Sequence, residues 1–398
     1  MSVATYFANV ALFDGRSMRT KAGVLVSSGE IAWVGAHARA PKIAHAAHQV
    51  DGRSSTLLPG LIDCHVHLCF DGSADFAGEA AALTDTLAAL KAVKNAARHL
   101  EAGVTSVRDL GGRKTSVIEV GAAIERGMIP GPRVVAAGQA LTITGGHGHS
   151  IGVARQVDGA DEVRKAVREE IRAGALAIKL IATGGVLTPG ITADFTAFTP
   201  EELEAAVDEA HTWGRRVAAH AIGATGIMRS VLAGVDSIEH GSQIGAEAAR
   251  LMKESGTFHV PTISAIRGIV EHPDEVPAYA VEKALALAEQ QHDAFRRAVR
   301  AGVRHACGTD AGTPFNPHGN APHEIVSMVE WGMTPLKALQ AATSNAAELL
   351  GLPDVGSVKA GMAADLVLYD EDPVEEIAAL LQPVMVMKAG EVVAGEER

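Results

Sequence analysis

Two histidines separated by one residue end an apolar run at residues 58–68. If the run is a β-strand, successive side chains alternate between its faces, so His65 and His67 project to the same side. Two imidazoles at the end of a buried strand can share one metal ion. On this spacing alone, a pair of core or surface histidines is an equal alternative. The choice depends on whether the rest of the chain supplies further ligands.

Four more candidate ligands stand at the ends of other apolar runs. They are Lys179, His220, His240 and Asp310. One histidine at the end of a strand is more often a core residue than a ligand. Four histidines, an aspartate and a lysine at five such ends are hard to explain as packing when those ends meet in one place. The sequence therefore predicts a metal site.

Lys179 differs from the other candidates because an ammonium group near metal cations would be repelled. A buried lysine loses its proton readily, and its neutral amine can react with carbon dioxide. The resulting carbamate is an anion with two oxygens, which can bridge two metals. The alternative is an outward lysine whose stem packs on its neighbours. That alternative is weakened because the run 177–181 carries no other charge.

The middle of the chain repeats one architecture, in which a helical segment ends at a glycine and an apolar strand follows. Glycine there is typical of the left-handed residue that closes a helix, and the hydrophobic period then changes from 3.6 to 2. Residues 161–173 and 199–213 are expected helices, the second with a capping box at Thr199 and Glu202. The expected strands are residues 58–68, 104–107, 133–138, 177–181, 217–220, 237–240, 258–261 and 303–308.

Eight strands with helices between them predict an α/β fold, a (β/α)8 TIM barrel. A doubly wound open sheet is the alternative, but it would rarely need eight consecutive units. Short strands and turns precede and follow the barrel, so the two ends of the chain are expected to meet in one small β-sandwich domain. We expect residues 1–57 and 358–398 to form that domain and residues 58–357 to form the barrel.

The composition is that of a globular protein and excludes several kinds of partner. The chain has 398 residues, of which 47% are hydrophobic, and a net charge of -12. Without a cluster of lysine and arginine, neither nucleic acid nor an anionic membrane is an expected partner. The three cysteines and the absence of a signal-peptide pattern favour a cytoplasmic protein. Cys64 and Cys307, in apolar runs, are expected to be small buried residues.

Together with other short motifs, these residues give the chain a resemblance to a known family. It resembles the amidohydrolase superfamily, and within it the metal-dependent dipeptidase (prolidase-like) and imidazolonepropionase-like branch. The resemblance covers nearly the whole chain. It rests on residues 59–67 (PGLIDCHVH), 144–147 (TGGH), 178–180 (IKL), 219–221 (AHA), 238–241 (IEHG), 308–310 (GTD) and 359–366 (KAGMAADL).

The resemblance implies a centre of two divalent metal ions, with zinc as the expected metal. It assigns the ligands as follows: His65, His67 and Asp310 to the first metal, His220 and His240 to the second, and carboxylated Lys179 as a bridge beside a hydroxide. Two cations that share one water lower its pKa, and one of them polarises the scissile carbonyl. Asp310 is expected to take the proton during attack and to deliver it to the leaving amine.

The resemblance also suggests residues that contact the substrate. His147, in the glycine-rich loop 141–149, matches a family position that contacts a substrate carbonyl or carboxylate, and we expect it to stabilise an oxyanion. Arg267 is a candidate partner for a substrate carboxylate, although an exposed loop arginine is an equal alternative. His318 is a further candidate after the last strand. Several dipeptidase members carry tyrosine where this chain has Ile222, so strict dipeptidase specificity does not follow.

We therefore expect a metal-dependent hydrolase that cleaves an amide bond in a small molecule, an N-acyl amino acid or a dipeptide-like compound. The same motifs occur in enzymes acting on cyclic amides, carbamates, ureas and amide-linked toxins, so such a substrate is the alternative. Lys179 disfavours a deaminase, and the complete ligand set disfavours a non-catalytic scaffold. A homo-oligomer is common in the family, but no pattern in this chain shows which faces would associate.

Overall fold

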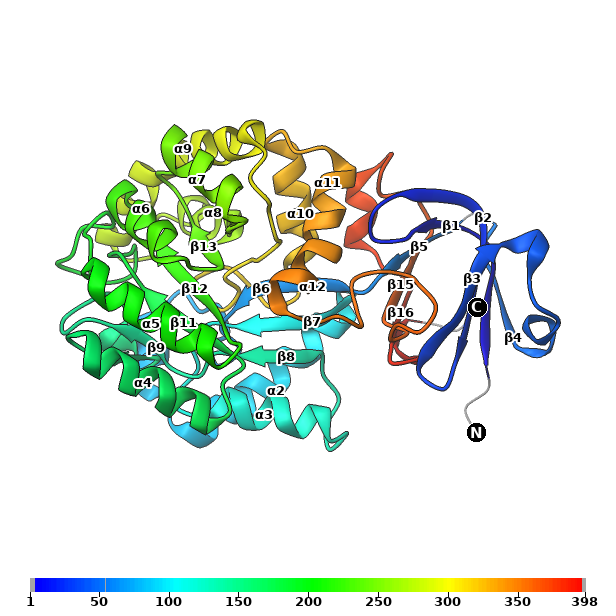
Figure 1. Ribbon diagram of the computed structural model, residues 1–398, viewed down its shortest axis with the longest axis horizontal. Helices are drawn as coiled ribbons and strands as arrows, with labels where there is room; N and C mark the ends of the chain where they lie inside the picture. The colour runs from blue at the N-terminus through cyan, green and yellow to red at the C-terminus, as the bar shows by residue number, and fades with distance from the viewer. Residues whose placement is uncertain (1–3, 54, 396–398) are drawn as a thin grey trace.

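The computed structural model describes residues 4–53 and 55–395. Strands from the two ends of the chain form one mixed sheet of eight strands, called here the terminal sheet, at the right of Figure 1. Its order is β17-β16-β15-β5-β1-β2-β3, and β4 pairs with β1. Its strands are β1 (Thr5–Phe13), β2 (Met18–Ser27), β3 (Glu30–Ala36), β4 (His48–Asp51), β5 (Thr56–Pro59), β15 (Leu366–Tyr369), β16 (Met385–Lys388) and β17 (Glu391–Gly395).

The antiparallel pairing of β5 with β15 joins the two ends of the chain. Phe13, Leu58 and Tyr369 of the terminal sheet are buried in the same apolar cluster as Val104 and Val107 of the central strands. One core therefore connects the terminal sheet to the rest of the molecule. The terminal strands form a single continuous sheet, so the β-sandwich is not confirmed, and the expected domain boundaries stay a prediction.

Gly60 alone separates the terminal sheet from the central strands, because β5 ends at Pro59 and β6 begins at Leu61. A Cβ atom at residue 60 would lie 2.1 Å from Thr105 Oγ1, so the close approach of the Thr105 side chain favours glycine here. The first expected strand, residues 58–68, is thus two strands in two different sheets.

The central strands form two parallel sheets. The first contains β6 (Leu61–Val66), β7 (Val104–Asp109) and β8 (Arg133–Ala136), and the second has the order β10-β9-β11-β12-β13-β14. The strands of the second sheet are β9 (Ala140–Thr142), β10 (Ala154–Gln156), β11 (Ala177–Ile181), β12 (Arg216–Ala221), β13 (Ser237–His240) and β14 (Phe258–Val260). Seven of the eight expected strands are therefore present in the central part, and β9 and β10 were not expected.

The expected eighth strand, residues 303–308, has only one bridge, between His305 and His259. Backbone hydrogen bonds nevertheless place it between β14 and β6: Cys64 N donates to Cys307 O at 2.8 Å, and Ala306 N donates to His259 O at 3.0 Å. These bonds support the α/β architecture that was expected. A closed ladder of eight strands is not formed by the described residues, so the closed barrel stays a prediction.

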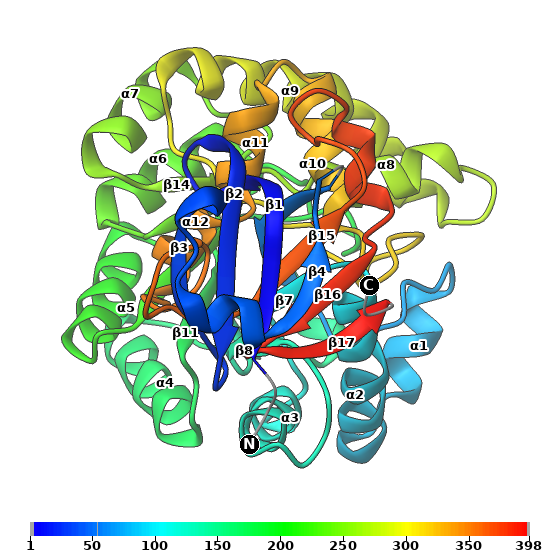
Figure 2. The same ribbon diagram turned by 90° about the vertical axis from the view of Figure 1, so that its right-hand side faces the viewer.

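Helices surround the central strands, and Figure 2 shows them behind and around the terminal sheet. The α-helices are α1 (Phe76–Ala82), α2 (Asp85–Glu101), α3 (Ser116–Glu125), α4 (Ala160–Ala173), α5 (Pro200–Thr212), α6 (Ala224–Ala233), α7 (Ala246–Ser255), α8 (Ile263–Glu271), α9 (Ala278–Ala301), α10 (Ala321–Glu330), α11 (Pro335–Ala341) and α12 (Ser344–Leu350). Short 3-10 helices are η1 (His37–Arg39), η2 (Lys42–Ala46), η3 (His149–Ile151) and η4 (Ile377–Leu381). In the described part of the chain, no helix has the length and apolar character that crossing a membrane requires.

Local sequence signals explain several of these boundaries. The capping box at Thr199 is present, with Thr199 Oγ1 accepting from Glu202 N and the Glu202 carboxylate accepting from Thr199 N. Gly174 and Gly234 close α4 and α6 in the left-handed conformation, as expected. Cys64 and Cys307 are buried free thiols, which confirms their expected place in the core.

Candidate metal centre

The candidate ligands come together in one cavity. His65 and His240 stand near the ends of β6 and β13, and Lys179 and His220 lie within β11 and β12. Asp310 follows the segment 303–308, and His67 follows β6. All of them line this cavity, and all are buried except His67, which is half-buried. Parallel strand ends that meet at one edge of a sheet therefore bring residues far apart in the sequence to one place.

The donor atoms lie within reach of a shared cation. Asp310 Oδ1 is 3.3 Å from His65 Nε2 and 3.2 Å from His67 Nε2. One donor atom each from His65, His240 and Asp310 lie within 4.8 Å of one another. The ring centres of His220 and His240 are 4.5 Å apart. Imidazole nitrogens with one carboxylate form a donor set that suits zinc.

Each of the four histidines has one ring nitrogen bonded to a protein oxygen. His65 Nδ1 bonds Glu239 Oε2 (2.9 Å), and His67 Nδ1 bonds the Gly111 carbonyl (3.2 Å). His220 Nε2 bonds the Gly184 carbonyl (2.7 Å), and His240 Nδ1 bonds Thr262 Oγ1 (2.7 Å). Acceptors of this kind fix the tautomer of each ring and leave the other nitrogen available to a metal.

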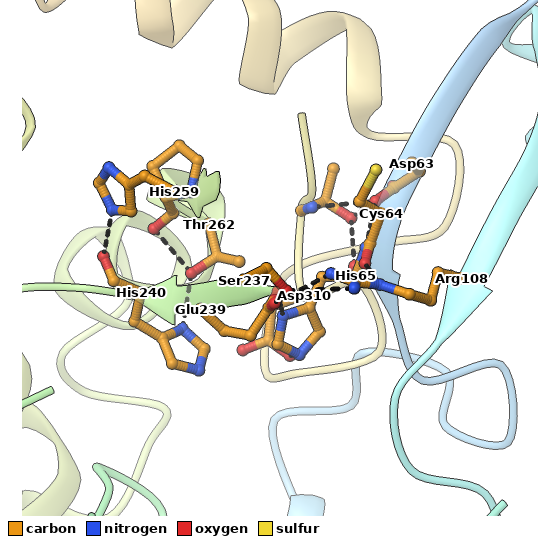
Figure 3. A network of polar contacts seen from close by, with 12 residues as sticks. Asp63, Cys64, His65, Arg108, Ser237, Glu239, His240, His259, Thr262 and Asp310 are labelled. Atoms are coloured by element: carbon orange, nitrogen blue, oxygen red, sulfur yellow. Dashed lines mark hydrogen bonds and ion pairs between the residues drawn. The ribbon is translucent and has the colours of Figure 1, made fainter. Parts of the chain in front are cut away.

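A buried ionic network bonds the ring of His65 at Nδ1 (Figure 3). Glu239, fully buried, bonds His65 through Oε2 and Arg108 Nη2 through Oε1 at 2.9 Å. Arg108 also donates to the Cys64 carbonyl (2.6 Å) and to Ser237 Oγ (3.1 Å), and Ser237 Oγ donates to Glu239. Because a buried charge is costly without partners, this network favours one fixed arrangement of β6, β7 and β13.

Asp310 is fixed by β6. Its backbone N–H donates to the His65 carbonyl at 2.7 Å, and the preceding Thr309 donates to Asp63 through both its N–H (3.0 Å) and its hydroxyl (2.7 Å). The φ angles of Asp310 and His240 are 61° and 67°, in the left-handed region that most side chains avoid. Such strain is retained where the surrounding bonds impose it, and it turns both side chains at the cavity.

Burial sets the charge states in the cavity. It lowers the pKa of His65, His220 and His240 well below the usual value of histidine, so these rings are neutral, as metal ligation requires. Burial by itself would raise the pKa of the Asp310 carboxyl, but the adjacent His65 and His67 hold that pKa below its ordinary value. Asp310 is therefore an anion at neutral pH.

Lys179 is a buried amine in the cavity that lacks a hydrogen-bond partner among the described residues. Its side chain is 3% exposed. Burial lowers the pKa of Lys179 to about 8, against the opposing effect of Glu239 and Asp310. A buried ammonium without acceptors is unfavourable, whereas a carbamate on this amine would have oxygens to offer to cations. The residues present thus fit a centre of two metals bridged at Lys179.

His147 reaches the same cavity from the loop after β9. Its ring centre lies 4.8 Å from that of His220, and its Nδ1 lies 2.6 Å from Thr188 Oγ1. The left-handed glycines Gly145 and Gly148 turn the loop tightly on either side of it. With Nδ1 occupied by Thr188, Nε2 is the nitrogen available to a substrate.

Arg267 and His318 do not line the cavity. Arg267 instead bonds Ser327 Oγ (2.8 Å) and Glu330 Oε2 (3.0 Å) of α10. The ring of His318 lies between the Phe70 carbonyl, 2.7 Å from Nε2, and His99 Nε2, 3.0 Å from Nδ1. These interactions commit both side chains to other protein groups, so the structure does not bring them to the candidate site.

Sequence reasoning did not single out Arg108, Glu239, Thr188 or Thr262 as parts of the site. A signal existed for the two charged residues, because each stands inside a strand that is otherwise buried. A charge in such a strand needs a partner, and a partner among the central strands lies near the ligands. The threonines gave no comparable signal.

Most of the remaining wall of the cavity is apolar. Phe70 and Phe76 pack against each other with ring centres 4.7 Å apart. Other apolar lining residues are Leu110, Ile151, Val153, Ile181, Val186, Leu187, Ile222, Ile266 and Ile269. A few convergent polar groups in a largely apolar cavity are typical of a site for a small organic molecule.

Known proteins match nearly the whole of this chain. The Amidohydrolase family matches residues 56–393. Ochratoxinase of Aspergillus niger is 36% identical over 415 residues, which cover 96% of this chain and 84% of that protein. Among solved structures, a Xaa-Pro dipeptidase with bound methionine has a TM-score of 0.90 and 34% identity, covering 98% of this chain and 99% of its own. The A. niger ochratoxinase structure has a TM-score of 0.90 and 33% identity, with coverages of 99% and 96%.

Proposed function

Because the chain belongs to the amidohydrolase family and is a hydrolase of carbon–nitrogen bonds, we propose that it cleaves an amide bond in an N-acyl amino acid or dipeptide-like compound with a large apolar acyl group. The observation that carries the proposal is an apolar cavity with histidines, Lys179 and Asp310 gathered on one wall. The family is generally metal-dependent, and the cluster of His65, His240 and Asp310 is suited to a cation.

Two divalent cations are the proposed cofactor, with zinc as the expected metal. His65, His67 and Asp310 would hold one, and His220 and His240 would hold the other. A carbamate on Lys179 would lie between them, which accounts for a buried amine without a protein acceptor. Bound there, the cations would supply a hydroxide at neutral pH and polarise the substrate carbonyl.

Asp310 and His147 are the proposed catalytic residues. Asp310 is an anion within 3.3 Å of two histidines, which supports a role in which its carboxylate accepts a proton from the attacking water and returns it to the leaving amine. His147 Nε2 is available to donate to the carbonyl oxygen as negative charge develops there. Amide hydrolysis requires both roles: Asp310 would transfer the proton from water to the leaving amine, and His147 would stabilise the negative charge on the carbonyl oxygen.

An amide-linked toxin or other neutral amide is the second candidate substrate. Apart from histidines, Lys179 is the single cationic side chain that the described residues contribute to the cavity lining. A substrate carboxylate would therefore depend on His147 or on the metals for a partner. A relative at 36% identity is named ochratoxinase, which supports an amide-linked toxin as this second candidate.

Metal content and substrate choice test the proposal together. Purified protein would be analysed for metals per chain and then assayed with N-benzoyl-L-phenylalanine, N-acetyl-L-phenylalanine, an alanyl dipeptide, a neutral anilide and a cyclic amide. We expect two metals and the fastest turnover with N-benzoyl-L-phenylalanine. Turnover of the anilide or cyclic amide alone would select the second candidate. Protein without metal that hydrolyses none of them, before or after zinc is added, would overturn both.

A further inference from the structure

The segment of residues 184–188 holds two histidines of the candidate site. It follows β11 and has no helix or strand of its own. The Gly184 carbonyl accepts from His220 Nε2 (2.7 Å), and Thr188 Oγ1 lies 2.6 Å from His147 Nδ1. Val186 and Leu187, between them, line the cavity. The conformation of this segment therefore determines how two ring systems and part of the apolar wall are placed.

Gly185 sits directly against the ring of His147. A Cβ atom at residue 185 would lie 2.3 Å from Nε2 and 2.5 Å from Cδ2 of that ring, so any side chain would displace it. Thr188 contacts the ring at Nδ1 and also accepts from Gly148 N at 3.3 Å. The segment thus contacts the ring of His147 at Nδ1 through Thr188 and over the ring face beside Nε2 through Gly185.

Two side chains of helix α9 that do not line the cavity hold the same segment. Lys283 Nζ donates to the carbonyls of Gly185 (3.2 Å) and Thr188 (2.7 Å). Tyr279 Oη donates to the Leu187 carbonyl between them at 3.1 Å. The two residues whose carbonyls Lys283 binds are the two that contact the ring of His147.

A lysine suits this position for physical reasons. An irregular segment has carbonyls that no ladder satisfies, and one ammonium can donate to two of them at once. Charge-assisted bonds of this kind are stronger than those between neutral groups. Lys283 is half-buried and does not line the cavity, so its contact with the segment is separate from any contact with substrate.

We propose that Lys283 is a positioning residue, which sets the ring of His147 by fixing Gly185 and Thr188 through their carbonyls. The proposal rests on the role of His147 in the proposed function. Lys283 acts on the substrate carbonyl only through His147 and the segment 184–188. Tyr279 adds a third, neutral anchor to the same segment.

Hydrogen exchange tests the anchoring without depending on activity. Lys283→Met keeps the aliphatic stem and removes all three donors. The matched control is Lys388→Met, because Lys388 is also half-buried and donates to a backbone carbonyl, that of Gly131 at 2.7 Å, far from the cavity. We expect exchange in residues 184–190 to accelerate about tenfold in Lys283→Met and to stay unchanged in Lys388→Met. Equal exchange in both variants would overturn the proposal.

Kinetics with N-benzoyl-L-phenylalanine test the effect on His147. We expect Lys283→Met to lower kcat on the order of 10-fold to 100-fold with little change in KM or metal content, because a displaced donor weakens stabilisation of the transition state. Lys283→Arg should restore part of kcat. An unchanged kcat, or a loss of metal that accounts for the effect, would overturn the proposal. If the unmodified protein hydrolyses no amide, the proposed function fails, and the exchange experiment still reports on the anchor.

Discussion

The two proposed parts of the site are held in different ways. His65 and Asp310 are fixed inside the molecule by β6 and by a buried ionic network of Arg108 and Glu239. His147 is held instead by an irregular segment whose carbonyls are bound by two side chains of α9. The first arrangement is built into strands, whereas the second can change when one loop changes. Substrate preference can therefore diverge while His65 and Asp310 stay in place, whereas His220 is shared, because Gly184 of the same segment bonds it.

Lys179→Ala should have the largest effect, because it removes the proposed bridge from the part held by strands. We expect fewer than two metals per chain and a loss of activity on the order of 1000-fold, as when one member of a cooperating set is removed. Metal analysis and initial rates provide the measurement. Added short carboxylates should rescue the variant partially, and Lys165→Ala, at an exposed position on α4, should behave like the unmodified protein. Full activity in Lys179→Ala would contradict the bridging role.

Glu239→Gln should weaken the metal centre without emptying it. The amide cannot hold the Nδ1 proton of His65 and the Arg108 guanidinium as the carboxylate does. We expect the metal dissociation constant to rise about 10-fold to 100-fold, measured by competition with a chelator. Glu324→Gln is the matched control, because Glu324 is equally buried and bonds Ser264 and Ile263 rather than a candidate ligand. Equal losses of affinity in both variants would mean that the effect is general destabilisation.

Thr188→Val should affect the other part alone. Valine has nearly the same shape but cannot bond His147 Nδ1, so the ring loses its fixed orientation. We expect kcat to fall about tenfold with unchanged metal content. Thr188→Ser keeps the hydroxyl and should restore most of the rate. A Thr188→Val protein that loses metal would break the distinction between the two parts, since the segment would then control both.

Strand periodicity was enough to predict where the candidate ligands meet. His65, Lys179, His220 and His240 each end or occupy a short apolar run, and parallel strands bring such positions to one edge. The sequence could not predict that residues 303–308 pair through one bridge only, because that depends on contacts with β14 and β6. It could not reveal Lys283 either, because its partners are backbone carbonyls of a segment without periodicity.

Position near a strand end was not enough to identify substrate contacts. Arg267 follows β14 closely, but Ser327 and Glu330, about 60 positions away in sequence, bind its guanidinium. His318 follows Asp310, yet His99 of α2 and the Phe70 carbonyl bind its ring. The polar group that a long side chain binds depends on which distant residues the tertiary fold brings near it. The pattern of one strand or loop does not contain the answer.

His318→Asn should have the smallest effect on activity, because His318 pairs with His99 outside the site. Burial lowers the pKa of His318 to about 4, although its bond to the Phe70 carbonyl opposes this, and burial also lowers the pKa of His99 well below its usual value. Both rings are thus neutral in the folded protein, and His318 Nδ1 accepts from His99 Nε2. Activity at neutral pH should change less than about twofold, because the ring does not line the cavity.

The same variant should change how stability depends on pH. In the unfolded chain both histidines titrate near pH 6.5, so below that pH the unfolded state binds more protons than the folded state. The free energy of unfolding should therefore fall between about pH 6.5 and pH 4, and His318 alone should contribute about 2 to 3 kcal/mol of that fall. Asparagine can still donate and accept hydrogen bonds but does not titrate. The free energy of unfolding of His318→Asn, measured by urea titration, should therefore fall less as the pH is lowered. His48→Asn, at an exposed position of β4, should keep the original decline. A slope in His318→Asn equal to that of the unmodified protein would show that this pair does not control acid sensitivity.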